Sequence, residues 1–105
     1  RERVRPLGLS ALIGRRRPIR AFEIVPEDGT QASLGKLLAR DALTEGLAEF
    51  EARRFAEAGL KFRQAAEICP EDAVAGLYLR NAARLMADPP PEDWTGAAAD
   101  PRDLR

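Results

Sequence analysis

The chain has 105 residues, a mass of 11.5 kDa and the length of one small domain. It contains no histidine and a single cysteine, Cys69, which excludes a histidine-assisted nucleophile, an intrachain disulfide and a CxxC redox or zinc motif. The formal net charge is zero, but residues 1–20 hold seven arginines against one glutamate, so basic charge is concentrated at the start of the chain.

Residues 1–26 predict a β-hairpin. Apolar side chains alternate from residue 7 to residue 13, and a second apolar run over 18–25 ends before Pro26. The connection, Gly-Arg-Arg-Arg-Pro at residues 14–18, is typical of a turn. An isolated hairpin is marginally stable in water, so we expect this one to need a sheet to join, which the chain does not encode.

Residues 27–33 predict a linker, and the Ala-, Leu-, Glu- and Arg-rich stretch over 34–88 predicts three helices. Ser33 is the expected N-cap of the first helix and Asp72 of the third, because their side-chain oxygens can accept from first-turn N–H groups. Pro70 is expected to end the second helix. The apolar residues at helical spacing are Leu43, Gly46, Leu47 and Phe50; Phe55, Ala58, Phe62, Ala65, Ala66 and Cys69; Val74, Leu77, Tyr78, Ala82, Leu85 and Met86.

Two further expectations concern the helices. The acid-first spacing of Glu49 with Arg53, and of Glu57 with Lys61, predicts two surface ion pairs one helical turn apart. Cys69 lies at a helix C-terminus, where the helix dipole disfavours a thiolate. We therefore expect Cys69 to be a small buried apolar side chain.

Residues 89–105 predict a proline-rich tail. Three consecutive prolines, Pro89–Pro91, favour a polyproline II conformation and cannot continue the preceding helix. The following Glu-Asp-Trp is compatible with a short turn that folds Trp94 back. Trp94 then either holds the tail on the helices or docks on another domain or subunit, and the sequence leaves both interpretations open.

The helical part resembles one tetratricopeptide repeat. The resemblance rests on two small residues, Gly46 and Ala58, that allow two antiparallel helices to approach closely, on Phe50 and Phe62 beside them, and on Pro70 at the repeat's end. It covers about 34 residues, and Glu49 stands where the repeat usually has a large residue. The segment over 72–87 would be the first helix of a next repeat, or a cap.

A longer resemblance spans residues 7–96. The sequences Leu7-Gly8, Gly-Arg-Arg-Arg-Pro-Ile at 14–19 and Ala-Phe-Glu-Ile at 21–24 are similar to the last strand pair of class III adenylate/guanylate cyclase catalytic domains. In some bacterial members a helical tail follows, with an ending like Leu-Tyr-Leu-Arg at 77–80 and Pro-Pro-Pro-Glu-Asp-Trp-Thr-Gly at 89–96 of this chain. The order and spacing of these motifs carry the resemblance.

The resemblance implies a parent that makes cyclic AMP from ATP with Mg²⁺, but not that this chain does so. The family's two metal-binding aspartates and its Asn/Arg pair precede these last strands, and none of them matches a residue here. Metal-assisted nucleotide chemistry needs converging carboxylates, whereas the strands offer only Glu23. We therefore expect no catalytic or metal-binding residue and no cofactor in this chain.

The candidates for protein contact are Arg15, Arg16, Arg17 and Trp94. The arginines could contact phosphate, but nucleic-acid binding usually needs aromatic side chains for stacking, and the nearby Phe22 is expected to point into a sheet. We therefore expect no nucleic-acid partner. No apolar run reaches the ~20 residues of a membrane span, which predicts a cytoplasmic segment without membrane contact, even if a parent is anchored elsewhere.

Because the chain starts at Arg1 and its only methionine is Met86, we expect a C-terminal piece of a longer protein. The predicted fold is α+β, mostly α, with a hairpin arm over 1–26, a linker over 27–33, a tetratricopeptide-like unit over 34–88 and a tail over 89–105.

The predicted function is a non-catalytic regulatory or interaction segment of a class III cyclase-like protein. Its partner would be the upstream cyclase domain or the dimer partner. The alternative is a free-standing tetratricopeptide-like adaptor. An unpaired strand edge within residues 7–25 would favour the cyclase segment over the adaptor.

Overall fold

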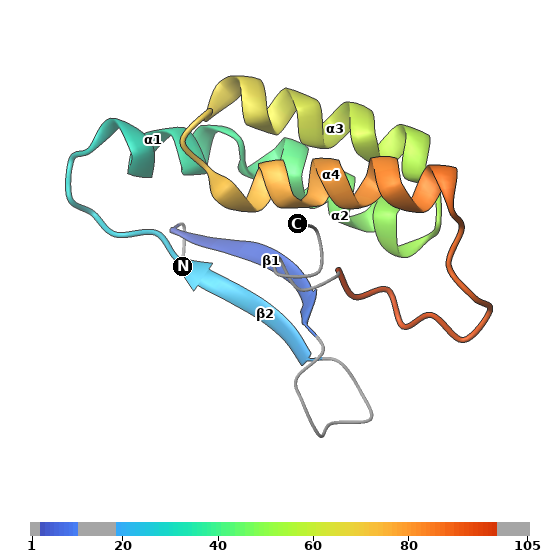
Figure 1. Cartoon of the computed structure of the whole chain (residues 1–105). Coiled ribbons are helices and arrows are strands. Elements are labelled where there is room, and N and C mark those ends of the chain that lie inside the picture. Colours follow the sequence, from blue (N-terminus) through green and yellow to red (C-terminus); the bar gives the residue numbers. More distant parts are fainter. Residues whose placement is uncertain (1–2, 11–18, 99–105) are drawn as a thin grey trace.

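The computed structural model describes residues 3–10 and 19–98, and it consists of an antiparallel hairpin followed by helices (Figure 1). The predicted α+β, mostly α class is confirmed. The elements in chain order are β1 (Val4–Ser10), β2 (Ile19–Ile24), α1 (Gln31–Leu38), α2 (Arg40–Glu51), α3 (Phe55–Ile68) and α4 (Ala73–Ala87). The hairpin runs along one side of the helices, with β1 next to them and β2 outside (Figure 1).

The first strand differs from its predicted bounds. β1 begins at Val4, before the predicted start at residue 7, and contains Pro6, which has no N–H to donate to the ladder. The register shifts between Pro6, opposite Phe22, and Gly8, opposite Ala21, so the strand carries a β-bulge. The predicted strand residues 11–13 and the turn at 14–18 lie outside the described residues.

Helix α1 begins within the predicted linker. Thr30, and not Ser33, is the N-cap: the Thr30 Oγ1 accepts from the N–H of Ser33 at 3.1 Å. The Asp28 carboxylate in turn accepts from the N–H and the hydroxyl of Thr30, at 3.0 and 2.8 Å. The prediction for Ser33 is therefore wrong, because a better-placed hydroxyl lies one turn earlier in the chain.

The stretch predicted as one first helix is two helices, α1 and α2, which gives four helices in place of three. The break is at Ala39, which is buried and whose N–H is shared between the carbonyls of Gly35 and Leu37. Gly35 lies so close to Cys69 that a Cβ on it would come within 2.9 Å of the sulfur. No glycine or proline marks position 39, so nothing local in the sequence predicts the break.

The core forms where α2, α3 and α4 meet around Phe50, which is fully buried. The rings of Phe55, Phe62, Tyr78 and Trp94 pack edge-on against Phe50, with centroids between 5.3 and 6.0 Å away. The predicted close approach at Gly46 is confirmed, because a Cβ there would lie 2.6 Å from the Phe62 ring. Among the described residues, the contiguous apolar core belongs to the helices and the tail, and the hairpin contributes no side chain to it.

Candidate functional site

A buried ion pair that the sequence analysis missed attaches the hairpin to the helices. Arg5, on β1, is 1% exposed, and its guanidinium donates to both carboxylate oxygens of Asp72, at 2.6 and 3.0 Å. Asp72 is also the N-cap of α4, as predicted, and accepts from the N–H of Val74. One carboxylate therefore both starts a helix and holds the strand beside it.

Two further charged groups extend this ion pair. The Nε of Arg5 donates to Glu23 at 2.7 Å, and the Lys36 ammonium contacts the other Glu23 oxygen at 3.1 Å. Burial lowers the pKa of Arg5, but its hydrogen bonds with Asp72 and Glu23 outweigh this effect and the pKa is raised. Burial raises the pKa of Glu23, but Arg5 and Lys36 outweigh it and the pKa is lowered. Arg5 and Glu23 therefore stay ionised at neutral pH.

The helices also bind the main chain of β1. The Tyr78 hydroxyl donates to the carbonyl of Leu7 at 2.7 Å, and Arg40 donates to the carbonyl of Val4 at 3.0 Å. Burial raises the pKa of Tyr78 to about 12, and the nearby negative charge of Glu51 adds to this. Tyr78 therefore remains a neutral hydrogen-bond donor across the physiological pH range.

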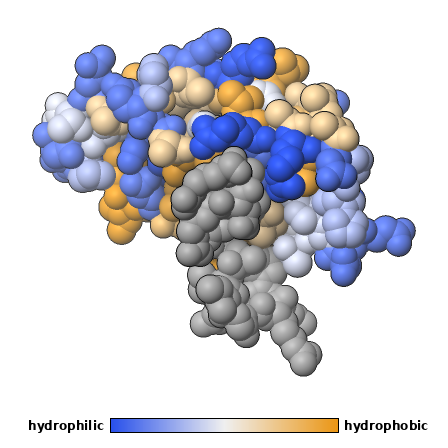
Figure 2. All heavy atoms as spheres, in the orientation of Figure 1, coloured by the Kyte–Doolittle hydropathy of each residue, from blue (hydrophilic) through white to orange (hydrophobic). Residues whose placement is uncertain are grey.

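The outer face of the hairpin is apolar and largely uncovered. Val4 pairs with Ile24 and Pro6 with Phe22, so these four side chains share the face turned away from the helices. Phe22 is 59% and Ile24 76% exposed, which contradicts the expectation that Phe22 points into a sheet. Figure 2 shows hydrophobic atoms over the end of the hairpin where β2 finishes. We call these four residues the outer patch.

Within the described residues, β2 is the strand that offers an edge for a further strand. On β1, helix side chains already bind the carbonyls of Val4 and Leu7. β2 pairs with β1 alone, and within residues 3–10 and 19–98 no strand covers its other edge. Unpaired edges of this kind are where additional strands join a sheet. The unpaired edge expected within residues 7–25 is thus present on β2.

Trp94 folds the tail back onto the helices. Its ring packs edge-on against Phe50 and Phe55, with centroids 5.4 and 5.6 Å away, and its indole N–H donates to the Ala97 carbonyl at 3.2 Å. Of the two interpretations of Trp94, the structure shows the first, a contact that holds the tail on its own helices.

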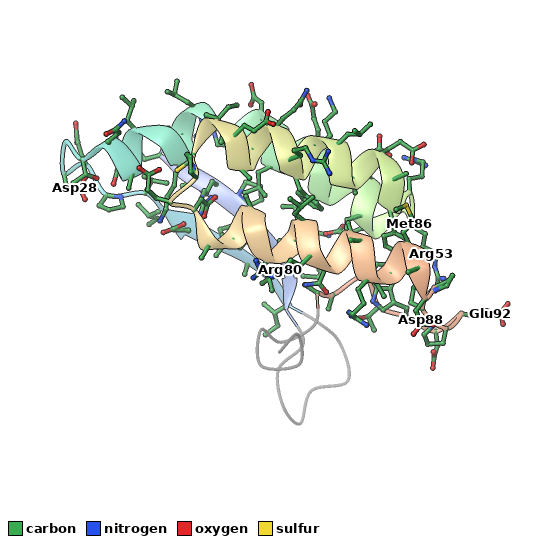
Figure 3. All side chains as sticks on the ribbon, turned by 45° about the horizontal axis from the view of Figure 1, so that its top comes forward. Asp28, Arg53, Arg80, Met86, Asp88 and Glu92 are labelled. Carbon is green, nitrogen blue, oxygen red and sulfur yellow. The ribbon has the colours of Figure 1, made fainter. Side chains whose placement is uncertain are left out.

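Arg53 is a second residue that the sequence analysis missed. Its guanidinium donates to the successive carbonyls of Pro90, Pro91 and Glu92, and it lies 5.5 Å from the centre of the Trp94 ring. Figure 3 shows Arg53 at the end of the molecule that also carries Glu92. Arg53 has φ 67°, a left-handed conformation that is rare outside glycine, so the backbone is strained where this side chain meets the tail.

Both predicted surface pairs, Glu49 with Arg53 and Glu57 with Lys61, are wrong. Arg53 lies beyond the end of α2 and cannot pair with Glu49, which binds Arg54 instead. Lys61 likewise pairs with Glu45 on α2, at 2.7 Å, and not with the acid one turn earlier in α3. Lys61 thus joins α3 to α2, and Glu49 pairs with the residue that precedes α3.

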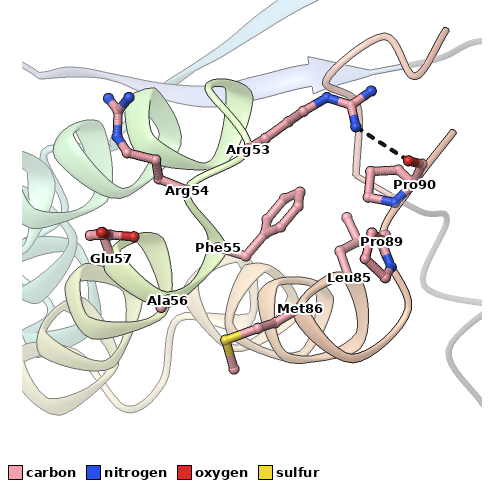
Figure 4. Close-up of a pocket in the computed structure, with 9 residues that line it drawn as sticks. All are labelled: Arg53, Arg54, Phe55, Ala56, Glu57, Leu85, Met86, Pro89 and Pro90. Carbon is pink, nitrogen blue, oxygen red and sulfur yellow. Dashed lines mark hydrogen bonds between the residues drawn. The ribbon is translucent and has the colours of Figure 1, made fainter. Parts of the chain in front are cut away.

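An open pocket of about 510 Å³ lies between the start of α3, the end of α4 and the tail. Its lining consists of Arg53, Arg54, Phe55, Ala56, Glu57, Leu85, Met86, Pro89 and Pro90 (Figure 4). Figure 4 shows the Arg53 side chain turned to Pro90 and the Arg54 guanidinium pointing away. Because the tail and Glu49 hold these two guanidiniums, the pocket offers mainly apolar surface.

The remaining features considered in the sequence are the cysteine, a metal site, a membrane span and the three arginines. Cys69 is fully buried, as expected, and burial raises the pKa of its thiol. Within residues 3–10 and 19–98 no group of three His, Cys, Asp or Glu side chains is placed to hold a metal ion. In the same part of the chain, no helix has the length and apolar character needed to cross a bilayer. Arg15, Arg16 and Arg17 lie outside it.

Comparison with protein-family models, with curated proteins and with solved structures finds no match to this chain.

Proposed function

We propose that this chain is a non-catalytic regulatory and interaction segment, the C-terminal part of a class III nucleotide cyclase-like signalling protein. The parent would make cyclic AMP from ATP with Mg²⁺ in an upstream domain in the cytoplasm. The segment would bind the cyclase domain or the dimer partner. It would need no cofactor of its own and would contact neither nucleic acid nor membrane.

The observation that carries this proposal is the asymmetry of the hairpin. Its inner side is fixed to the helices through Arg5 and Tyr78. Its outer side presents the outer patch and the open edge of β2, a combination that favours a larger sheet or a covering layer. The hairpin would then contact both the helices and the cyclase domain and connect the two.

Regulation would follow from this connection. A domain that covers β2 is joined to α4 through two contacts, from Glu23 to Arg5 and from Arg5 to Asp72. A shift of the helices would therefore move the strand that the cyclase domain uses. Since the family's active site forms at a dimer interface, a small displacement there would alter turnover.

The first test is the reading frame upstream of Arg1. The proposal expects a domain with two strand-end aspartates and a downstream Asn–Arg helix, and a frame without such a domain would overturn it. In the complete protein, we expect Phe22→Lys with Ile24→Lys to change cyclic AMP production. Leu60→Lys, on an equally exposed leucine of α3, should leave it unchanged. Equal effects of the two variants, or unaltered activity, regulation and dimerisation after removal of residues 27–105, would count against the proposal.

A second candidate is the free-standing adaptor, and one observation favours it. Tyr78 and Arg40 bind main-chain carbonyls, which every peptide possesses. The face that an adaptor would use is, however, occupied by β1 of the same chain. An adaptor would therefore bind its partner only after the hairpin has left.

A further inference from the structure

The face of the helices that holds β1 is built like a site for one kind of peptide. We define the strand-binding face as Asp72, Tyr78, Arg40 and Leu47. We infer that this face recognises an extended segment in which an arginine precedes a glycine by three residues, and that β1 occupies it in cis. The inference concerns the helices alone and does not depend on a cyclase parent.

The arginine is required by charge and by shape. Asp72 has only 2% of its side chain exposed, so a face without a cation would leave a buried carboxylate uncompensated. Arg5 meets both oxygens of Asp72 with two parallel N–H donors and uses its Nε for Glu23. A lysine ammonium cannot reproduce this planar arrangement, so the site distinguishes the two cations.

The glycine is required by space and by backbone conformation. Gly8 has φ 87°, and a Cβ on it would lie 2.2 Å from the Tyr78 hydroxyl and 3.0 Å from Leu47. Any larger residue would push the segment away from the hydroxyl that binds the carbonyl of Leu7. The carbonyls of Val4 and Leu7 are bound whatever side chains these positions carry. The strand-binding face therefore recognises three features of a segment: the arginine, the glycine and the extended main chain.

The hairpin is attached in a way that permits exchange. The contiguous apolar core among the described residues contains no hairpin side chain, so the helices keep their core when the hairpin leaves. The link between β2 and α1 has no helix or strand, and a Cβ added to Gly29 within it would meet no atom within 4 Å. The ion pair of Asp72 and the hydrogen bonds of Tyr78 and Arg40 would be lost with β1, and a segment of the same kind in trans can replace them.

The test uses the full chain with Arg5→Ala, which weakens the hairpin and leaves the strand-binding face intact. The probe is a fluorescent, end-blocked peptide with the sequence of residues 3–10. Matched control peptides carry alanine in place of the arginine at position 5 or of the glycine at position 8. We expect the Arg5→Ala chain to bind the native peptide at least tenfold more tightly than either control peptide. The unaltered chain should bind it at least tenfold more weakly than the variant, because its face is filled.

The folding of the variant is followed by helical circular dichroism. If Arg5→Ala is partly unfolded, we expect the native peptide to restore helix content and the control peptides to fail, since one control lacks the guanidinium and the other carries a Cβ that clashes with the Tyr78 hydroxyl. A second full-chain variant, Gly8→Ala, opens the face by steric conflict and should also bind the native peptide. Equal binding of all three peptides, or no binding and no restored helix in either variant, would overturn the inference.

Discussion

The helices bind two other segments of the chain, the hairpin and the tail, through different kinds of interaction. The hairpin is attached by a buried ion pair and by hydrogen bonds to its main chain, with Arg5 and Tyr78 as the central groups. The tail is attached by the Trp94 ring on Phe50 and Phe55, with the exposed Arg53 bound to its carbonyls. A polar attachment demands particular residues, whereas an apolar one requires mainly contact area. The two ends of the chain should therefore respond differently to substitution.

The largest effect is expected from Arg5→Ala. Removing the guanidinium leaves the buried Asp72 without its partner, which typically costs about 3–5 kcal/mol. The measurement is the free energy of unfolding in urea, followed by circular dichroism. The control is the double variant Arg5→Met with Asp72→Asn, which removes both charges and keeps an N-cap acceptor for α4. It should recover more than half of the loss, and a double variant as unstable as the single one would show that charge burial is not the cause.

Alkaline pH should weaken the hairpin attachment next. Tyr78 has a folded-state pKa of about 12 and an ordinary value of 10, so the unfolded chain loses the phenolic proton first as the pH rises. Stability is then complete below pH 10 and falls between pH 10 and 12, by about 3 kcal/mol for a difference of two pKa units. Tyr78 is the chain's only tyrosine, so tyrosinate absorbance reports this group alone. A midpoint near 10 would contradict the buried hydroxyl, and Tyr78→Phe should abolish this phase.

For the tail, Trp94→Ala should cost about 2 kcal/mol, less than a fully buried aromatic because the ring is half-buried. Trp94→Phe keeps a ring against Phe50 and Phe55 and should cost about half as much. Urea unfolding followed by circular dichroism measures both, since the chain's single tryptophan is absent from these variants. Equal losses would mean that the indole hydrogen bond to Ala97, and not the ring contact, holds the tail.

The smallest effect is expected at Arg53. Its hydrogen bonds and its position over Trp94 are exposed to solvent, so Arg53→Ala should cost only about 0.5–1 kcal/mol. Arg53→Gly removes the same guanidinium but relieves the left-handed backbone, so it should be more stable than the alanine variant by up to about 1 kcal/mol. Urea midpoints of the two variants compare them directly. A glycine variant that is no better than alanine would mean that φ 67° carries no strain.

Local patterns were sufficient for the existence of the two strands, for most of the helices and for one close packing position. The spacing of Phe50, Phe55 and Phe62 correctly placed them in the core, and the absent side chain at Gly46 correctly marked the close approach of α2 and α3. The N-cap at Asp72 was also correct. The break at Ala39 was missed because no glycine or proline marks it.

The residues of the candidate site could be predicted only in part from the sequence. Phe22 was noticed, but its exposure depends on which face of the hairpin the helices cover. Arg53 was assigned to a surface pair because helical spacing favoured it, while the actual chain leaves the helix and turns the side chain to the tail. The resemblance to a cyclase end and the proposed regulatory role remain predictions.

The sequence by itself therefore determined the class of fold, since periodicity, caps and breakers act over a few neighbouring residues. Only the tertiary structure decided how the hairpin is held, because Arg5 and Asp72 are 67 positions apart and nothing local favours their pairing. An arginine in a strand and an aspartate before a helix are each ordinary on the surface. They become a specific attachment only when folding buries them together, where each charge needs the other.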